Sequence, residues 1–149
     1  MGNSIILRAR GLIVDNGHVL LTRAHKEPSY TYLLGGKVEH GEPIKTALAR
    51  EVGEEMGIHG HIGQFLGCME HSWHQGSRLL HEINFVFLIT GNNFSHEQTP
   101  QSQEEHISFE WVAFENLKDA NVLPKALVTY IPMWSENKEH EYFVSKMNV

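Results

Sequence analysis

Three closely spaced glutamates, Glu51, Glu54 and Glu55, are the residues of this sequence best suited to chemistry. On a helix, the i, i+3 and i+4 spacing brings their carboxylates to one side. The arrangement is electrostatically costly, because Glu51 and Glu55 repel each other near the negative end of the helix dipole. A hard cation such as Mg²⁺ prefers oxygen ligands and would turn this cost into a binding site. The alternative is a solvated acidic face, which is what most glutamate clusters on helices are.

The segment that carries these glutamates predicts a helix from Pro43 to Met56. Proline suits the first turn, the following residues are mostly good helix formers, and Gly57 is a plausible C-terminal stop. An apolar stripe that should pack on a sheet recurs every four residues, at Ile44, Leu48, Val52 and Met56. The glutamates overlap the edge of this stripe, so we expect them to be partly buried. Gly53 costs about 1 kcal/mol relative to alanine, which indicates close packing against another element.

Strand-like segments lie on both sides of this helix. They cover residues 5–14, 19–22, 30–34, 61–66, 79–90 and 108–112. The pairs Asn16-Gly17 and Gln75-Gly76 predict hairpin turns. Residues 91–105 are polar and predict a long loop, a kind of segment that is often functional in compact domains. A second helix is predicted over residues 124–134, which Pro132 would end or bend, and residues 135–149 give no firm prediction.

Length and charge limit the classes of function. The 149 residues, of which 41% are hydrophobic, predict a single domain over residues 1–149. Twelve Lys and Arg against eighteen Asp and Glu give a net charge of −6, which disfavours nucleic acid and membrane partners and leaves a homodimer open. The lone Cys68 cannot form an intramolecular disulfide, and the N-terminus lacks the apolar run of a secretory signal. We therefore expect a cytoplasmic protein.

A longer motif surrounds the acidic cluster. Gly36 is followed after five residues by Glu42, and after seven more by Arg50-Glu51-Val52-Gly53-Glu54-Glu55-Met56-Gly57-Ile58. Residues 36–58 thus resemble the Nudix box, G-x5-E-x7-R-E-U-x-E-E-x-G-U with U aliphatic, at every specified position. The chain is similar to the Nudix hydrolase (MutT-like) family. This resemblance implies an α/β protein with the Nudix fold, a mixed β-sheet sandwiched between α-helices (an α/β/α sandwich).

The resemblance also implies an activity. Nudix enzymes are Mg²⁺-dependent pyrophosphohydrolases, with Mn²⁺ as a substitute, that cleave a phosphoanhydride bond of a nucleoside diphosphate linked to another moiety. Nucleoside triphosphates and ADP-sugars are examples of such small-molecule nucleotide substrates. Two alternatives are a non-catalytic Nudix-fold module that binds a nucleotide or partner, and an enzyme that removes 5′ phosphates from RNA. The intact box favours the enzyme, because a non-catalytic relative would be free to lose its charged residues.

Family roles can be carried over to matching positions. Glu51, Glu54 and Glu55 resemble the metal-binding carboxylates, and Arg50 resembles the arginine that orients them. The backbone carbonyl of Gly35 matches a further metal ligand. Glu39 and Glu42, which extend the box, are assigned a structural role. The general base stays open between three carboxylates: Glu51 in the box, and Glu104 and Glu105 on the later loop.

Substrate contacts are predicted from the flanking segments. Tyr30 and Tyr32 precede the glycine pair, where the family often places an aromatic residue near the base, although packing is an equal alternative for both. Arg23 and Glu82 are further candidates, and an ordinary cross-strand role is as plausible for Glu82. Eleven histidines without a compact ligand set do not indicate zinc. The residues that would distinguish substrate subgroups match neither of the two patterns considered, so the sequence leaves the substrate open.

Overall fold

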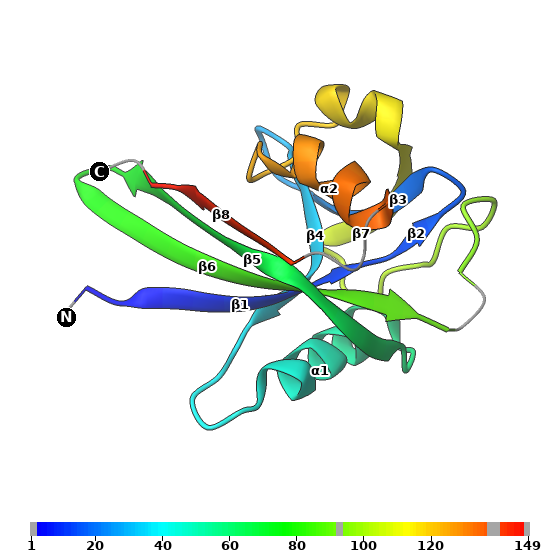
Figure 1. Cartoon of the computed structure of the whole chain (residues 1–149), viewed down its shortest axis with the longest axis horizontal. Coiled ribbons are helices and arrows are strands. Elements are labelled where there is room, and N and C mark those ends of the chain that lie inside the picture. The colour runs from blue at the N-terminus through cyan, green and yellow to red at the C-terminus, as the bar shows by residue number, and fades with distance from the viewer. Residues whose placement is uncertain (1–2, 92–93, 137–140, 148–149) are drawn as a thin grey trace.

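The computed structural model describes residues 3–91, 94–136 and 141–147. Its centre is one mixed sheet of eight strands in the order β2-β3-β4-β1-β6-β5-β8, with β7 paired to β3. The helices α1 (Ile44–Met56) and α2 (Leu127–Glu136) lie on opposite sides of this sheet (Figure 1). The strands are β1 (Ile5–Leu12), β2 (Val14–Asp15), β3 (His18–Ala24), β4 (Thr31–Lys37), β5 (His61–Gln75), β6 (Arg78–Thr90), β7 (Ile107–Ala113) and β8 (Tyr142–Lys146).

The sheet divides into two halves that share β4. The first part of β4 pairs antiparallel with β3, from Thr31 to Leu33, and its second part pairs antiparallel with β1, from Leu34 to Lys37. β1 then runs parallel to β6, and β6 forms a long antiparallel hairpin with β5. The outer ends of β1, β5, β6 and β8 extend beyond both helices (Figure 1). The predicted glycine pair therefore lies where the two halves of the sheet diverge.

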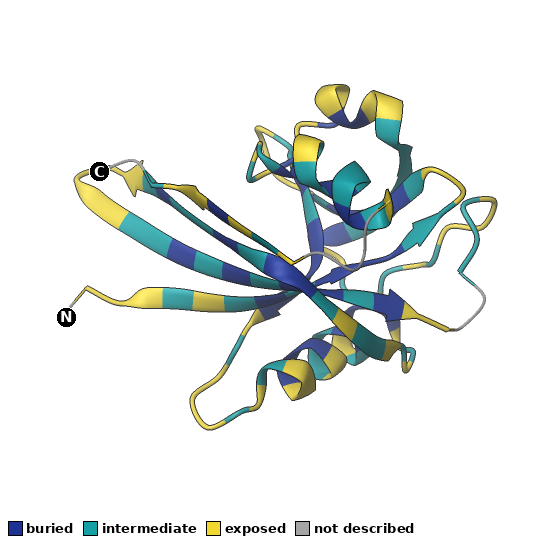
Figure 2. Ribbon diagram, in the orientation of Figure 1, coloured by how far each residue is buried: buried dark blue, intermediate teal, exposed yellow. Residues whose placement is uncertain are grey.

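Each helix buries its apolar face in a separate core. On the side of α1, Leu48 and Val52 are fully buried with sheet residues that include Ala9 and Leu34. On the side of α2, Ile131 and Trp134 are fully buried with sheet residues that include Leu12. Figure 2 shows the buried residues gathered where the strands cross between the helices. This arrangement confirms the predicted α/β/α sandwich, with an apolar stripe on each helix as the physical cause.

Local signals at turns and helix ends are confirmed. Asn16 and Gly17 adopt positive φ angles of 45° and 72° between β2 and β3, as a tight hairpin turn requires. Gly76 has a φ of 65° between β5 and β6. α1 begins after Pro43, and Gly57 closes it in the left-handed conformation with a φ of 71°.

Several boundaries differ from the predictions. β1 ends at Leu12, and β5 continues to Gln75, well past the predicted Leu66. Of the two effects predicted for Pro132, an end of the helix is wrong, because α2 continues to Glu136 and the burial of Trp134 stabilises the turn beyond the proline. The short 3-10 helix η1 (Phe114–Asp119) and strand β8 had no prediction. The part of the chain without a firm prediction includes residues 137–140 and 148–149, which lie outside the described residues.

None of the helices in the described ranges is long and apolar enough to cross a membrane. The cytoplasmic location and the homodimer stay predictions.

Candidate metal and active site

Helix α1 presents the three glutamates at graded depths. Because Leu48, Val52 and Met56 anchor the helix in the core, the adjacent face carries Glu55, which is only 5% exposed. The side chain of Glu51 is 16% exposed, whereas that of Glu54 is 51% exposed. The expectation of partial burial is therefore confirmed for Glu51 and Glu55, and Glu54 lies at the solvent edge of the cluster.

The glycine pair in β4 makes room for these carboxylates. A Cβ on Gly36 would lie 2.6 Å from the carboxyl carbon of Glu51, so any side chain there would displace this carboxylate. Gly35 has a φ of 130°, and a Cβ on it would lie 2.0 Å from the carbonyl oxygen of Ala9. Only glycine allows the backbone to pass so close to both neighbours. The carboxylates of Glu51 and Glu55 thus lie between α1 and the glycine pair of β4.

Glu55 is the most perturbed acid of the cluster. Burial, followed by the nearby charge of Glu51, raises the pKa of Glu55 to about 8 from a usual value of 4.5, although Arg10 and a backbone hydrogen bond from Gly35 act in the opposite direction. Its Oε2 is buried without a hydrogen-bond partner. Burial also raises the pKa of Glu51. A buried carboxylate oxygen without a partner, next to a second carboxylate, fits a divalent cation.

Arg50 holds the acidic residues around it. Its Nε donates to Glu42 at 2.7 Å, its Nη1 donates to Glu51 at 3.1 Å and to Glu54 at 3.3 Å, and its Nη2 donates to the carbonyl of Lys37 at 3.2 Å. The hydrogen bonds from Arg50 lower the pKa of Glu42 and keep it ionised. The guanidinium fork therefore joins the loop before α1 to the helix, and it also holds Glu51 and Glu54 by hydrogen bonds.

The three carboxylates of the cluster do not converge on one point, as they would around a bound metal ion. Within the described parts of the chain, no group of three Asp, Glu, His or Cys side chains converges in a geometry ready to hold a metal ion. The reason is visible in the hydrogen bonds, because Glu51 and Glu54 both face Arg50. A cation would have to draw these carboxylates towards Glu55.

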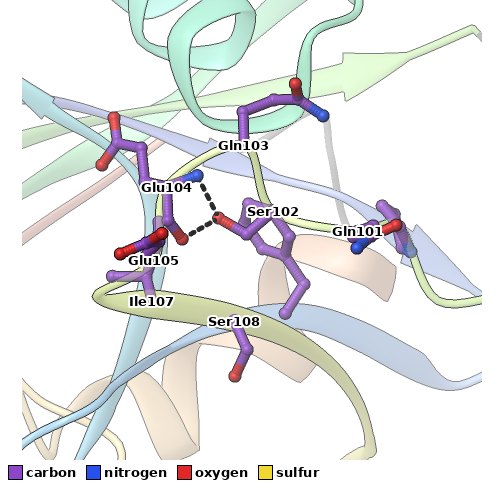
Figure 3. Close-up of a pocket in the computed structure, with 9 residues that line it drawn as sticks. Gln101, Ser102, Gln103, Glu104, Glu105, Ile107 and Ser108 are labelled. Atoms are coloured by element: carbon purple, nitrogen blue, oxygen red, sulfur yellow. Dashed lines mark hydrogen bonds between the residues drawn. The ribbon is translucent and has the colours of Figure 1, made fainter.

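The loop after β6 brings a fourth carboxylate to the cluster. The backbone N–H of Gln103 donates to the carbonyl of Glu55 at 2.7 Å, which fixes this loop to the C-terminal turn of α1. The charge of Glu104 contributes to the raised pKa of both Glu51 and Glu55. Figure 3 shows Gln103 and Glu104 on this loop, which also lines a shallow cavity of about 450 Å³.

Glu105 lies next to Glu104 but in a different environment. It is exposed, and its backbone carbonyl accepts a hydrogen bond from the His25 ring at 3.2 Å. Glu104 is half-buried, with its backbone held by the hydroxyl of Ser102 at 3.0 Å. Of the two loop candidates, Glu104 is the one whose charge reaches the cluster.

Tyr32 connects the acidic cluster to the opposite face of the sheet. Burial, and next the charge of Glu55, raises the pKa of Tyr32 to about 12. The guanidinium of Arg10 lies 5.2 Å from the centre of the Tyr32 ring. The centres of the Tyr30 and Tyr32 rings are 5.7 Å apart. Arg10 also donates to Asn84 and to the carbonyl of Leu33, both at 3.1 Å. Arg10 was not predicted, since an arginine in a strand carries no local signal of function.

A large cleft opens beyond these tyrosines, beside the start of α2. It has a volume of about 1150 Å³ and is lined by residues of β1, β5, β6 and β8 and by the segment before α2. Tyr30 and Glu82, two of the predicted substrate-binding residues, both line it. Glu82 accepts a hydrogen bond from Arg8 at 2.8 Å and lies 3.4 Å from the His71 ring. Burial raises the pKa of Glu82, but the hydrogen bonds with His71 and Arg8 outweigh burial and lower this pKa to about 2. An anionic acceptor is thus fixed on the floor of the cleft.

Arg23 does not join this group. It lies in β3, where its guanidinium donates to Glu110 at 2.5 Å and to the Ser29 hydroxyl at 3.2 Å, and it is not among the residues that line the cleft. The charge of Arg10 thus acts on Glu82, Tyr32 and Glu55, and the Tyr30 ring lies beside that of Tyr32, whereas Arg23 does not line the cleft.

Comparison with known proteins identifies the family. The model of the NUDIX domain matches residues 6–130, whereas no curated protein sequence matches the chain significantly. A MutT protein from Methanosarcina mazei Go1 is 24% identical with a TM-score of 0.70, and the match covers 94% of this chain and 99% of that one. A MutT Nudix hydrolase from Burkholderia pseudomallei is 26% identical with a TM-score of 0.61, and the match covers 76% and 86%. A MutT protein from Bacillus halodurans is 17% identical with a TM-score of 0.65, and the match covers 95% and 88%. With a family match that covers the strands from β1 to β7, the acidic helix and the start of α2, this chain belongs to the Nudix hydrolase family.

Proposed function

We propose that the protein is a Mg²⁺-dependent pyrophosphohydrolase that cleaves a phosphoanhydride bond of a nucleoside diphosphate linked to another moiety. The observation that carries this proposal is the buried Glu55, whose Oε2 has no partner and whose pKa is raised beside Glu51. Mn²⁺ would substitute, since it also accepts carboxylate ligands. When bound, such a cation neutralises phosphate oxygens and activates water.

The residues around the glycine pair would hold the cation and keep it in place. Glu51, Glu54 and Glu55 would supply carboxylate ligands, with the carbonyl of Gly35 as a further oxygen. Arg50 would hold Glu51 and Glu54 at the cluster through the hydrogen bonds described above. Because Glu54 is exposed, we expect its substitution to weaken metal binding less than substitution of Glu55.

A carboxylate has to accept the proton of the attacking water. Glu51, Glu104 and Glu105 are the candidates, and the influence of Glu104 on the pKa of both Glu51 and Glu55 supports Glu104 over its neighbour. Glu104 is half-buried on this loop, and from this position its carboxylate would be able to reach the attacking water.

Substrate contacts would extend from the cluster into the cleft. Tyr32 lies at the junction, and the Tyr30 ring at the cleft wall offers a stacking surface for a base. Glu82, held by Arg8, would accept hydrogen bonds from base or sugar groups. Arg23 remains a weaker candidate, because its guanidinium is already paired with Glu110.

A substrate panel tests the proposal. Nucleoside triphosphates, ADP-sugars, dinucleoside polyphosphates and RNAs with 5′ phosphates would be assayed for phosphate or pyrophosphate release with and without Mg²⁺. We expect metal-dependent release from at least one class, a loss of at least about 100-fold in Glu55→Gln, and no change in the control Glu115→Gln on the exposed surface of η1. Full activity of Glu55→Gln would remove the proposed centre, and a folded protein inactive on every class would favour a binding module.

A further inference from the structure

The cleft beside α2 has a charge that is opposite to that of the whole chain. The net charge is −6, yet the residues that line the cleft include four cations: Arg8, Lys26, Lys125 and Lys146. The only lining carboxylate in the described part of the chain is Glu82, and Arg8 already pairs with it at 2.8 Å. Among the described lining residues, no further carboxylate thus balances the three lysines.

These lysines lack an acidic partner within the described part of the chain. Across residues 3–91, 94–136 and 141–147, no ion pair joins Lys26, Lys125 or Lys146 to an acidic side chain. Lys26 lies instead 5.2 Å from the centre of the Tyr30 ring. All three lysines are exposed, so their positive charge faces the solvent that fills the cleft. Like charges that converge on a concave surface attract an anion.

Aromatic rings between these charges provide a place for a nucleoside. His71 and Trp73 stack in β5 with ring centres 4.9 Å apart, and both line the cleft together with Tyr30. Aromatic faces bind bases with little dependence on base identity. A nucleoside itself is neutral and leaves the lysines without a partner, and the phosphates that are cleaved belong at the acidic cluster on α1.

We propose that the cleft binds a further phosphate on the sugar of the nucleotide, so that the substrate is a nucleotide phosphorylated at a second position. This inference rests on the proposed function, because it places the cleaved anhydride at the acidic cluster and the nucleoside in the cleft. Two sources carry this chemistry: a small nucleotide with a 3′-phosphate, and the 5′ end of an RNA whose next phosphodiester follows the first nucleoside. The lysines bind phosphate as point charges and suit either source.

The test measures binding of probes that contain no anhydride, so it is independent of hydrolysis. AMP and adenosine 3′,5′-bisphosphate, and the corresponding guanosine pair, would be titrated in the presence of Mg²⁺ by calorimetry and by intrinsic tryptophan fluorescence, to which Trp73 in the cleft contributes. We expect the bisphosphate to bind at least about tenfold more tightly than the monophosphate, and this advantage to shrink at high salt. A 5′-phosphorylated dinucleotide in the same titration distinguishes the sources, because it binds more tightly than the bisphosphate only if the cleft accepts a continuing chain.

Lysine variants decide whether the cleft provides the advantage. The double substitution Lys125→Gln with Lys146→Gln should remove most of the bisphosphate preference while AMP binding and hydrolysis of an unsubstituted nucleotide change little. Lys118→Gln, on the exposed surface of η1, is the matched control. Equal affinity for the two nucleotides of each pair, an absence of binding by both, or a preference that survives the double substitution would overturn the proposal. A negative result here with an active enzyme would leave the proposed function intact.

Discussion

Replacement of Glu55 by glutamine should stabilise the metal-free protein at alkaline pH. The pKa of Glu55 is raised to about 8 from 4.5, so the native protein retains a proton that the unfolded chain releases between these values. The free energy of unfolding therefore falls as the pH rises from 4.5 to 8, and the whole penalty is present above pH 8. The difference between the two pKa values corresponds to a loss of at most about 5 kcal/mol in the free energy of unfolding. Relaxation and entry of water around the carboxylate reduce such penalties, and we expect a fall of at least about 2 kcal/mol.

The assay is urea unfolding of the protein in a chelating buffer at pH 5, 6.5 and 8. Wild-type protein should lose stability across this series, whereas Glu55→Gln, which retains the shape and polar character of the side chain, should remain nearly level. Addition of Mg²⁺ at pH 8 should stabilise the wild type more than the variant, because the variant lacks one of the proposed carboxylate ligands. Parallel pH profiles of the two proteins would refute the reasoning, since Glu55 would then be ionised in the folded protein without cost.

Two further predictions use matched pairs of variants. Gly36→Ala places a Cβ 2.6 Å from the Glu51 carboxyl and should reduce kcat at least about 100-fold, whereas Gly53→Ala, whose Cβ meets nothing within 4 Å, should raise the free energy of unfolding by about 1 kcal/mol with activity unchanged. Normal turnover of Gly36→Ala would contradict the close approach. Glu104→Gln should lower kcat about 100-fold or more and flatten the acidic limb of its pH profile, while Glu105→Gln should resemble wild type. The reverse order would assign the base to Glu105.

The parts of the fold that the sequence predicts well are those set by local chemistry. Gly57 ends α1 because a left-handed residue is required there, and Asn16-Gly17 forms its hairpin for the same reason. The depth of Glu55 also follows from its position at the edge of the apolar stripe. Each of these features depends on a few neighbouring residues and not on the rest of the chain.

Features that depend on distant contacts were not predictable in this way. The strand β8 (Tyr142–Lys146) forms because β5 extends far enough for its residues Gly67 to His71 to pair with it, and neither segment alone indicates the partner. Gly53 was expected to pack closely, and this expectation is wrong, because its surroundings are open and the helix tolerates the glycine without such a contact. The basic cleft likewise assembles from four strands and the segment before α2.

The roles of charged residues show the same division. The cluster on α1 follows from helical spacing, whereas the pairing of Arg8 with Glu82 joins residues 74 positions apart. Arg10 comes to lie beside Tyr32 only through the register of β1 with β4. The residues proposed to bind metal could therefore be predicted from one segment, whereas those proposed to bind substrate are brought together only by the folded sheet.

Binding of Mn²⁺ to the metal-free protein, followed by the electron paramagnetic resonance signal of the free ion, tests directly whether Glu55 holds a cation. This measurement needs no knowledge of the substrate. We expect that wild-type protein binds Mn²⁺, that Mg²⁺ competes for the site, and that Glu55→Gln weakens binding at least about tenfold while the surface variant Glu115→Gln does not. Equal Mn²⁺ affinity in wild type and Glu55→Gln would contradict this expectation, because the cation would then be held by other residues.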